Sequence, residues 1–526
     1  MKQTLLAKWR ELSWIDTKVT KALPLGEGVL DTNGFNALEV DKLFDAINCA
    51  STLIGQAVLY RSLAQPMDKI HEVEAKQAAV EELQNNPELK SAVETLIAIA
   101  NQHETNLYRL LFGEFLSSFG TARNEHEIEG YGYLQYKRAI RFITELVEQV
   151  QHAPQAQSAY LQSLFEHIKA FAGSRTYCLM TEAVYLTETQ MQSKQERKTS
   201  FMPAVVFYPR IIKPMLLVLA AIVYGALDYF VPFIMEAIPQ EALFLSPFLL
   251  LYFPLVGSFD RDHFIIPLRN EFKNCDELAQ VLDAVGQMDE LLSFLKLNET
   301  FGHAMVLPTL IESEQHRITL HEAMNPILAK QNPDYVGNNL SMDHEKLLLI
   351  TGPNSGGKTA FCKTVTQIQL MAQIGGFVPA QAATLSIADR IFYQVPEISQ
   401  LNDGEGRFGT ELKRTKDIFL ASSARSFVVL DELSEGTTFE EKMESSATVL
   451  DGFYRKGNST ILITHNHQLV DKLLKQRMGV ARQVEFIDDA PTHRLIAGIS
   501  RVSHADRVAK KIGFSRDDIN RYLLGK

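Results

Sequence analysis

Cysteine and tryptophan are scarce in this sequence, whose 526 residues include four cysteines and two tryptophans. The cysteines (Cys49, Cys178, Cys275 and Cys362) lie far apart, and no two of them form a CxxC pair. This spacing argues against a zinc site and against a disulfide framework, and it fits a reducing compartment.

An excess of positive charge is absent as well. The chain carries 52 Lys and Arg against 63 Asp and Glu, a formal net charge of −11. A protein that works mainly by coating nucleic acid is basic, so any contact with DNA must come from a local patch. Residues 1–18 lack the uninterrupted apolar run of a signal peptide, so we expect a cytoplasmic protein.

The hydrophobic pattern divides the chain into five segments. Residues 1–34 form an N-terminal segment of mixed character, and residues 35–200 have the apolar spacing of long helices, which predicts the first part of a helical lever domain. A charge-poor stretch covers 201–260, and the helical pattern returns over 261–325. Over 326–526 helical patterns alternate with short apolar runs that are typical of buried parallel strands. The predicted fold class is α + α/β, with the helical lever domain followed by a domain with a mainly parallel sheet.

The charge-poor stretch contains two strongly apolar runs, at 215–237 and 242–259. The second run has 18 uncharged residues, which reaches the lower limit for crossing a bilayer. Arg210 and Lys213 on one side and Arg261 on the other would leave both ends of a membrane hairpin in the cytoplasm. Asp228 interrupts the first run, and Pro247 and Pro254 lie in the second, so a buried helical hairpin or a hydrophobic dimer contact remains an alternative to membrane association.

A glycine-rich loop follows the apolar run 347–351. It consists of Gly352, Pro353, Asn354, Ser355, Gly356, Gly357, Lys358 and Thr359. GxxxxGK[ST] between a strand and a helix is the pattern of a P-loop, whose backbone N–H groups surround the phosphates of ATP at a helix N-terminus. We predict that all eight residues bind ATP, that Lys358 reaches the β- and γ-phosphates as a catalytic residue, and that Thr359 binds Mg²⁺.

Two further strand ends carry residues that would complete this site. The run 426–432 ends in Asp431 and Glu432, the arrangement of a Walker B strand. Asp431 is predicted to bind Mg²⁺, and Glu432 to orient or deprotonate the attacking water. The run 460–465 ends in His465, which can sense the γ-phosphate from a neighbouring strand.

Taken together, these motifs resemble those of the MutS family, the DNA mismatch-repair ATPases. The loop sequence TGPNSGGKT, residues 376–381 and residues 431–437 are similar to segments of that family, and residues 50–66 more loosely resemble its lever domain. The resemblance implies an ABC-type P-loop ATPase domain at 326–526, ATP and Mg²⁺ as ligands, and a homodimer that encloses two ATP molecules.

The resemblance also assigns residues around the loop. Tyr335, in an aromatic-x-x-Asn segment that ends at Asn338, would stack on the adenine, with plain packing as the alternative. The family's Ser-Thr-Phe signature, which acts on the partner subunit's ATP, falls at Gly406, Arg407 and Phe408 and lacks its serine. Arg407 either supplies positive charge across the dimer interface or is a solvated loop residue.

Two departures from the family pattern bear on function. Nothing ahead of residue 30 corresponds to the mismatch-reading or connector domains, so the resemblance is to a shortened member. The apolar stretch 201–259 lies where the family carries its DNA clamp, and it has two basic residues, whereas a clamp needs many to meet phosphates.

Three hypotheses about function follow. The first is a DNA-associated, repair-type ATPase that acts as a dimer and recognises DNA structure rather than mispairs. The second is a membrane-associated ATPase with a hydrophobic hairpin at 215–259 on the lever tips and no mismatch recognition. The third is a nucleotide-switched scaffold with little hydrolysis, because the signature at 406–408 is altered.

Overall fold

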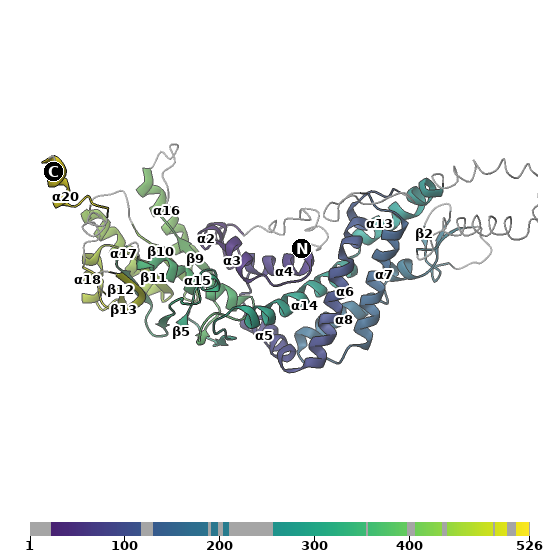
Figure 1. Cartoon of the computed structure of the whole chain (residues 1–526), viewed down its shortest axis with the longest axis horizontal. Helices are drawn as coiled ribbons and strands as arrows, with labels where there is room; N and C mark the ends of the chain where they lie inside the picture. Colours follow the sequence, from purple (N-terminus) through teal and green to yellow (C-terminus); the bar gives the residue numbers. More distant parts are fainter. Residues whose placement is uncertain are drawn as a thin grey trace, which may run out of the picture. The chain divides into compact units, whose positions relative to one another are not determined.

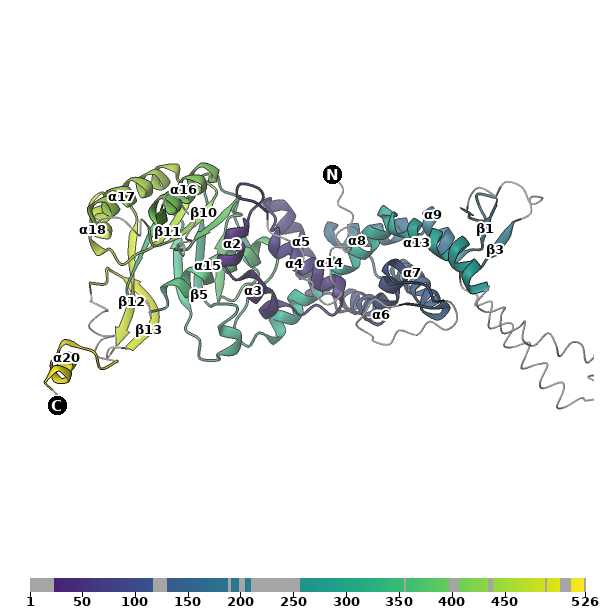
Figure 2. The ribbon, with the colours of Figure 1, turned by 90° about the horizontal axis from the view of Figure 1, so that it is seen from above.

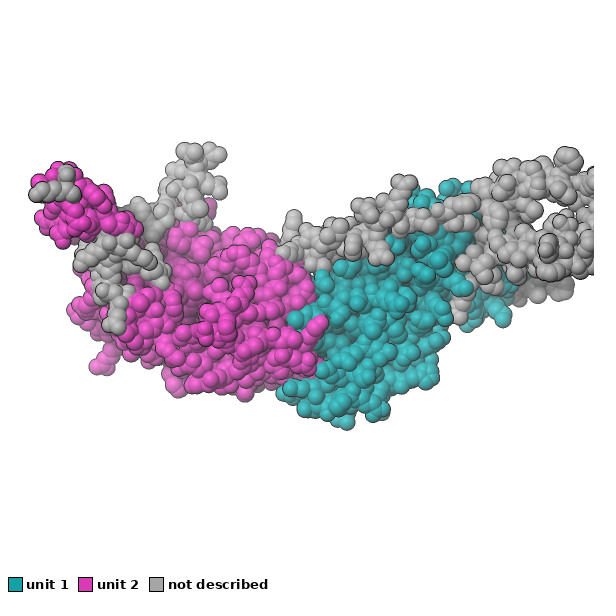
Figure 3. Space-filling view, in the orientation of Figure 1, with its two compact units in different colours: residues 1–19, 49–59, 81–293 teal, residues 20–48, 60–80, 294–526 magenta. Residues whose placement is uncertain are grey.

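The computed structural model describes most of the chain. The described residues are 23–116, 130–187, 191–197, 204–209, 256–353, 356–396, 406–433, 439–487, 490–501 and 512–524, with the backbone alone for 406–408 and 439. They divide into two compact units, coloured separately in Figure 3. Unit 1 contains residues 1–19, 49–59 and 81–293, and unit 2 contains residues 20–48, 60–80 and 294–526.

Unit 1 is mainly helical. Its helices are α6 (Pro87–Phe112), α7 (Tyr133–His152), α8 (Ala159–Phe171), α9 (Arg175–Thr181), η3 (Arg261–Ile265) and α13 (Ile266–Lys273), with parts of α4 (Leu53–Ala64), α5 (Ile70–Asn85) and α14 (Asp276–Thr300). The longest of them, α6, has 26 residues and begins with Pro87 behind Asn86, whose side chain accepts a hydrogen bond from the Leu89 N–H. This cap satisfies one of the free N–H groups of the first turn. Helix α6 packs against α7, and α7 against α8.

A small antiparallel sheet also belongs to unit 1. Its strands are β1 (Val184–Leu186), β2 (Met191–Gln192) and β3 (Val205–Phe207), in the order β2-β1-β3. Phe207 is buried and stacks on Phe264 of η3 with a ring-centroid distance of 5.0 Å. This aromatic contact attaches the sheet to the helices of the unit.

Two buried carboxylates lie at the N-terminus of α4. Asp289 of α14 accepts hydrogen bonds from the Thr52 N–H at 2.7 Å, the Thr52 hydroxyl at 2.7 Å and the Ser51 N–H at 3.0 Å. Glu104 of α6 accepts from the Leu53 N–H at 2.8 Å, and burial raises the pKa of Glu104 to about 7. These acids accept hydrogen bonds from N–H groups at the N-terminus of α4 that have no partner within the helix, so they fix α4 against α6 and α14.

Unit 2 is built on a six-stranded sheet in the order β13-β12-β7-β11-β10-β9. Figure 2 labels β10, β11, β12 and β13 of this sheet. The strands are β7 (Leu347–Thr351), β9 (Ile391–Gln394), β10 (Phe427–Asp431), β11 (Ser459–Ile463), β12 (Val480–Ile487) and β13 (Ala490–Ala497). Neighbouring strands pair in parallel, except that β13 pairs antiparallel with β12. The five residues of β7 are all buried, as expected for a parallel strand covered on both faces.

Helices α15 (Lys358–Gln373), α16 (Gly406–Ala421), α17 (Phe439–Lys456) and α18 (His467–Lys475) cover this sheet (Figure 1). One core cluster joins Leu347 and Leu349 of β7 and Val428 of β10 to Phe453 of α17 and Leu473 of α18. Because side chains alternate along a strand, Leu348 and its counterparts point to the other face, and they are buried as well.

A second sheet, with the order β4-β8-β5-β6, also belongs to unit 2. Its strands are β4 (Thr309–Leu310), β5 (Ile318–Ala323), β6 (Asn338–Met342) and β8 (Ala382–Leu385). The short helices are α2 (Thr32–Ala37), α3 (Val40–Ile47), η4 (Ala329–Gln331) and the C-terminal α20 (Arg516–Leu523). The Ile391 N–H donates to the Val29 carbonyl at 2.7 Å, so the chain before α2 covers the edge of β9.

The structure confirms the predicted strands at 347–351, 426–432 and 460–465, which form β7, β10 and β11 of one parallel sheet. The predicted lever domain included residues 35–48 and 60–80, which cluster with unit 2 in the structure. The unit boundaries fall inside α4, α5 and α14, where an unbroken helical pattern marks no division.

The predicted apolar hairpin at 215–259 lies almost wholly outside the described residues. Among the residues that the structure describes, no helix has the length and hydropathy needed to cross a bilayer.

We predict that Gly55→Ala destabilises unit 1. A Cβ atom at Gly55 would lie 2.1 Å from Oδ2 and 2.7 Å from Cβ of Asp289. Alanine normally stabilises a helix interior relative to glycine by about 1 kcal/mol. Here the overlap reverses the sign, and we expect a net loss of roughly 2 kcal/mol in the free energy of unfolding. Urea denaturation followed by circular dichroism measures it.

Gly173→Ala is the matched control, because its new methyl group would meet one carbonyl oxygen at 3.5 Å, an ordinary contact. An unchanged or higher midpoint for Gly55→Ala would show that Asp289 does not occupy this position.

Candidate phosphate-binding site

The glycine-rich loop joins the end of β7 to the start of α15, as predicted. Gly352 has φ of +134° and Gly357 has φ of +87°, backbone conformations that side chains with a Cβ rarely adopt. A Cβ at Gly356 would lie 2.8 Å from Cγ2 of Val484, so β12 approaches the loop too closely for a larger residue. The chain therefore needs glycine here for both conformation and space.

Lys358 begins α15 and is almost completely buried, with 2% of its surface exposed. Its Nζ donates a hydrogen bond to the Gly352 carbonyl at 2.5 Å, across the mouth of the loop. Burial lowers the pKa of Lys358, while the nearby Glu432 and Asp431 carboxylates oppose this shift. The ammonium group thus lies inside the loop and beside both acids.

Asp431 closes β10 and meets Thr359 of α15. The Thr359 hydroxyl donates to Oδ2 of Asp431 at 3.1 Å. Burial raises the pKa of Asp431, with the Thr359 hydrogen bond opposing and the Glu432 charge reinforcing the shift. The two predicted Mg²⁺ ligands are therefore neighbours, although 72 positions separate them in sequence.

Glu432 occupies a left-handed backbone conformation, with φ of +59°. Its N–H donates to the Ile463 carbonyl at 3.0 Å, and its Oε1 accepts from the His465 N–H at 3.0 Å. The His465 ring Nε2 lies 3.8 Å from the same Oε1. A non-glycine residue in this conformation is strained, and such strain is often found at functional sites.

The structure brings Lys358, Thr359, Asp431, Glu432 and His465 to one edge of the sheet. These residues follow β7, β10 and β11, which run in parallel, so their carboxyl ends share that edge. Ligands of open α/β sheets bind at such an edge. Asn354 and Ser355 lie outside the described residues, as do the side chains of Arg407 and Phe408, whose backbone forms the start of α16.

Tyr335 lies shortly before β6, and Asn338 is the first residue of that strand. Burial raises the pKa of Tyr335, and a hydrogen bond with Thr364 of α15 opposes this shift. The Asn338 side chain binds the backbone of β13, donating to the His493 carbonyl at 2.9 Å and accepting from the Leu495 N–H at 2.8 Å. Asn338 therefore ties β13 to β6 within the described structure.

Sequence reasoning missed His493, which this hairpin brings to the loop. A Cβ at Gly357 would lie 3.4 Å from the His493 ring Nδ1, and His493 has a left-handed φ of +61°. An exposed histidine beside a phosphate-binding loop is a candidate ligand group. No spacing rule links it to the loop, because the contact depends on the antiparallel pairing of β12 with β13.

The residues at the strand ends fit a magnesium–phosphate complex. A hydroxyl and a carboxylate are the hard oxygen donors that Mg²⁺ uses, and it usually takes the remaining ligands from phosphates and water. Among the described residues, no group of three or more His, Cys, Asp or Glu side chains gathers around one point, so an all-protein metal cage is absent there. Thr359 and Asp431 would hold the ion.

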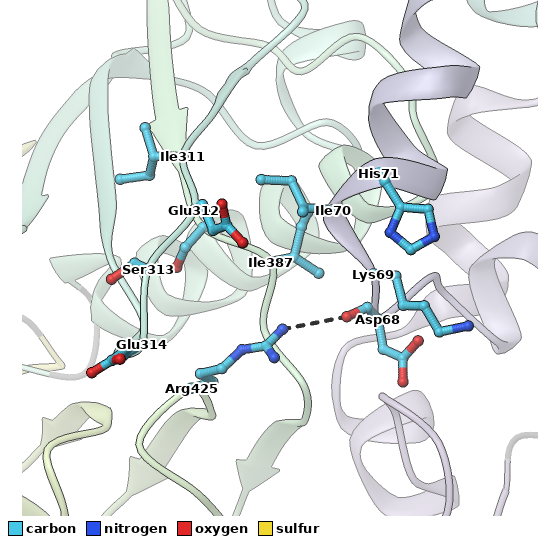
Figure 4. A pocket seen from close by; sticks show the side chains of 11 residues that line it. Asp68, Lys69, Ile70, His71, Ile311, Glu312, Ser313, Glu314, Ile387 and Arg425 are labelled. Carbon is cyan, nitrogen blue, oxygen red and sulfur yellow. Dashed lines mark hydrogen bonds between the residues drawn. The ribbon is translucent and has the colours of Figure 1, made fainter.

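A separate cavity of about 580 Å³ lies elsewhere in unit 2 (Figure 4). It is lined by Lys69 and His71 at the start of α5, Glu312 and Glu314 after β4, and Arg425 before β10. Arg425 donates to the Asp68 carbonyl at 3.4 Å. Because Arg425 precedes β10 and Asp431 ends it, this cavity lies at the opposite edge of the sheet from the glycine-rich loop.

Comparison with known proteins agrees with the resemblance. The profile of MutS domain III matches residues 21–294, more than half of the chain, and the profile of MutS domain V matches residues 348–520. The chain is 31% identical over 249 residues to the DNA mismatch repair protein MutS of Parabacteroides distasonis, over 45% of this chain and 28% of that protein.

Two further relatives give the same picture. Proteins of the same name from Thermotoga petrophila and Ehrlichia ruminantium are 29% identical over 259 and 262 residues, in each case 48% of this chain and 32% of the relative. The chain thus spans about a third of the length of the curated relatives that it matches.

Proposed function

Because the chain belongs to the MutS family, we propose that it binds ATP with Mg²⁺ and hydrolyses it to ADP and phosphate. One observation carries this proposal: Thr359 and Asp431 are hydrogen-bonded at 3.1 Å, with Lys358 buried beside them. The loop, the metal ligands and the acid of a P-loop ATPase therefore converge.

In this proposal Lys358 leaves the Gly352 carbonyl and binds the β- and γ-phosphates, while loop N–H groups donate to the phosphate oxygens. Thr359 and Asp431 would hold Mg²⁺, which would neutralise negative charge at the phosphates. Glu432 accepts a proton from the water that attacks the γ-phosphorus, and the γ-phosphoryl group leaves ADP as phosphate. His465, whose N–H orients Glu432, contacts the γ-phosphate.

The base and the partner subunit complete the proposed site. Tyr335 and His493 are the groups that we expect to contact adenine, with Asn338 fixing the His493 backbone. Arg407 and Phe408 at the start of α16 would meet the ATP of a second subunit, so that a homodimer encloses two ATP molecules. Residues 326–526 would form this ATPase domain, and 35–200 with 261–325 the levers that respond to it.

We further propose that the dimer acts on DNA. The relatives that match are named as DNA mismatch repair proteins, and the matches include the profile of MutS domain III. The acidic net charge of −11 restricts the contact to a local surface.

The first test is Lys358→Ala. We expect ATP affinity to fall by about 100-fold, because a buried charge that contacts phosphate is lost. Titration with a fluorescent ATP analogue measures the affinity, and thermal melting confirms the fold. Lys363→Ala is the control, since Lys363 lies on the same helix and pairs with Glu39 instead. Unchanged affinity in Lys358→Ala would falsify the site assignment.

The second test is Glu432→Gln. The variant keeps the shape of the side chain and loses the proton acceptor, so we expect turnover to fall by about 100-fold while ATP affinity stays. Mass measurement with ATP should then show an accumulated dimer. Glu440→Gln, at an exposed position of α17, is the control. Equal turnover in wild type and Glu432→Gln would mean that Glu432 does not accept the proton of the attacking water.

The third test addresses DNA. We expect binding to duplex or branched DNA at low salt that weakens steeply as salt rises, because phosphate contacts release counterions. Fluorescence anisotropy at about 50 and 200 mM salt measures the slope. A protein that hydrolyses ATP but binds none of these DNAs at low salt would leave the ATPase proposal standing and remove the DNA proposal.

A further inference from the structure

A lysine of α17 faces the proposed catalytic acid. Nζ of Lys442 lies 3.6 Å from Oε2 of Glu432, and the two side chains are 22% and 11% exposed. Helix α17 packs against β11, whose following residues include His465. An ion pair this far from solvent is weakly screened, so it orients its partners more strongly than a surface pair does.

Together with Lys442, the contacts of Glu432 fix the carboxylate from both sides. Oε1 accepts the His465 N–H at 3.0 Å, Oε2 faces Lys442, and the Glu432 N–H binds the Ile463 carbonyl. The left-handed backbone at Glu432 aims the side chain at this position. Two different elements, the turn after β11 and the first turns of α17, therefore set the direction of one side chain.

The position of Lys442 on its helix runs against local preference. The N-terminus of a helix carries partial positive charge, which favours acids in the first turn and bases in the last. Helix α17 follows this rule with Glu440 and Glu441 in its first turn and Arg455 and Lys456 in its last. Lys442 directly follows the two acids and breaks this charge preference. Residues that break a local preference are often found at functional sites.

We propose that Lys442 is a positioning residue for ATP hydrolysis, which acts by holding the Glu432 carboxylate toward the attacking water. The inference rests on the proposed function. At 3.6 Å from Oε2, the Lys442 ammonium attracts this oxygen electrostatically from beyond the distance of a direct hydrogen bond. Lys358 binds the phosphates, and Lys442 orients the Glu432 carboxylate.

The experiment compares Lys442→Met, Lys442→Arg and the control Arg455→Met, each alone and in the Glu432→Gln background. Arg455 lies on the same helix and pairs with Asp451 on the surface, so its loss removes an equal charge and one ion pair. ATP affinity, kcat and KM are measured for each protein, and thermal melting without nucleotide gives the Lys442–Glu432 coupling in a double-mutant cycle.

We expect Lys442→Met to lower kcat by about tenfold or more through misplacement of the acid, with KM and ATP affinity within about twofold of wild type. Lys442→Arg should restore most of kcat, and Arg455→Met should leave it unchanged. In the Glu432→Gln background Lys442→Met should have no further effect on kcat, because the residue acts through Glu432.

Three results would overturn the inference. If Lys442→Met leaves kcat unchanged while Glu432→Gln slows turnover, the positioning role of Lys442 is wrong and the proposed function still stands. A loss of ATP affinity that persists in the Glu432→Gln background would make Lys442 a nucleotide contact instead. A coupling free energy of zero in thermal melting would show that Lys442 and Glu432 do not pair. This measurement tests the inference even if the wild type hydrolyses no ATP. Absence of hydrolysis would by itself contradict the proposed function.

Discussion

The hydrogen bond between Thr359 and Asp431 is the contact on which the site depends. It joins the helix after the glycine-rich loop to the end of β10, and β11 separates β7 from β10 in the sheet. Such a contact is available only because the three strands run in parallel, so that each of their carboxyl ends opens on the same edge. If one strand ran in the opposite direction, its polar residues would lie at the far edge of the sheet, and no side chain is long enough to reach the loop from there.

Buried amides of α15 fix this helix at the other end. Gln367 donates to the Leu38 carbonyl at 2.8 Å, and Gln373 donates to the Met67 carbonyl at 2.8 Å, across 329 and 306 positions of sequence. A buried amide or carbonyl without a partner costs free energy, so each of these bonds restricts where α15 can lie. This explains why the segments around 38 and 67 belong to unit 2 and not to the helical unit that neighbours them in sequence.

The predictable parts of the molecule are those encoded locally. Residues 347–351 form a buried strand because four consecutive apolar residues precede Thr351, and the glycines after them suit a tight turn. The contacts of Asn338, His493 and Lys442 were not predictable, because each depends on how separate elements pack. The boundary between the units is hidden for a related reason: the helical period continues through α4, α5 and α14, and only their tertiary contacts assign the two ends of each helix to different units.

Charge explains why the proposed ligand is a metal complex of ATP and not the bare nucleotide. The carboxylates of Asp431 and Glu432 stand at the loop, and burial raises the pKa of Asp431, so the charged acid is already unfavourably placed. A triphosphate alone would add negative charge beside them and would be repelled at short range. A divalent cation held by Asp431 would supply positive charge and make the interaction with the phosphates attractive. Lys358 and Lys442, on the phosphate side and the helix side of the acids, then balance the remaining charge, and removing either lysine disturbs a different half of the same site.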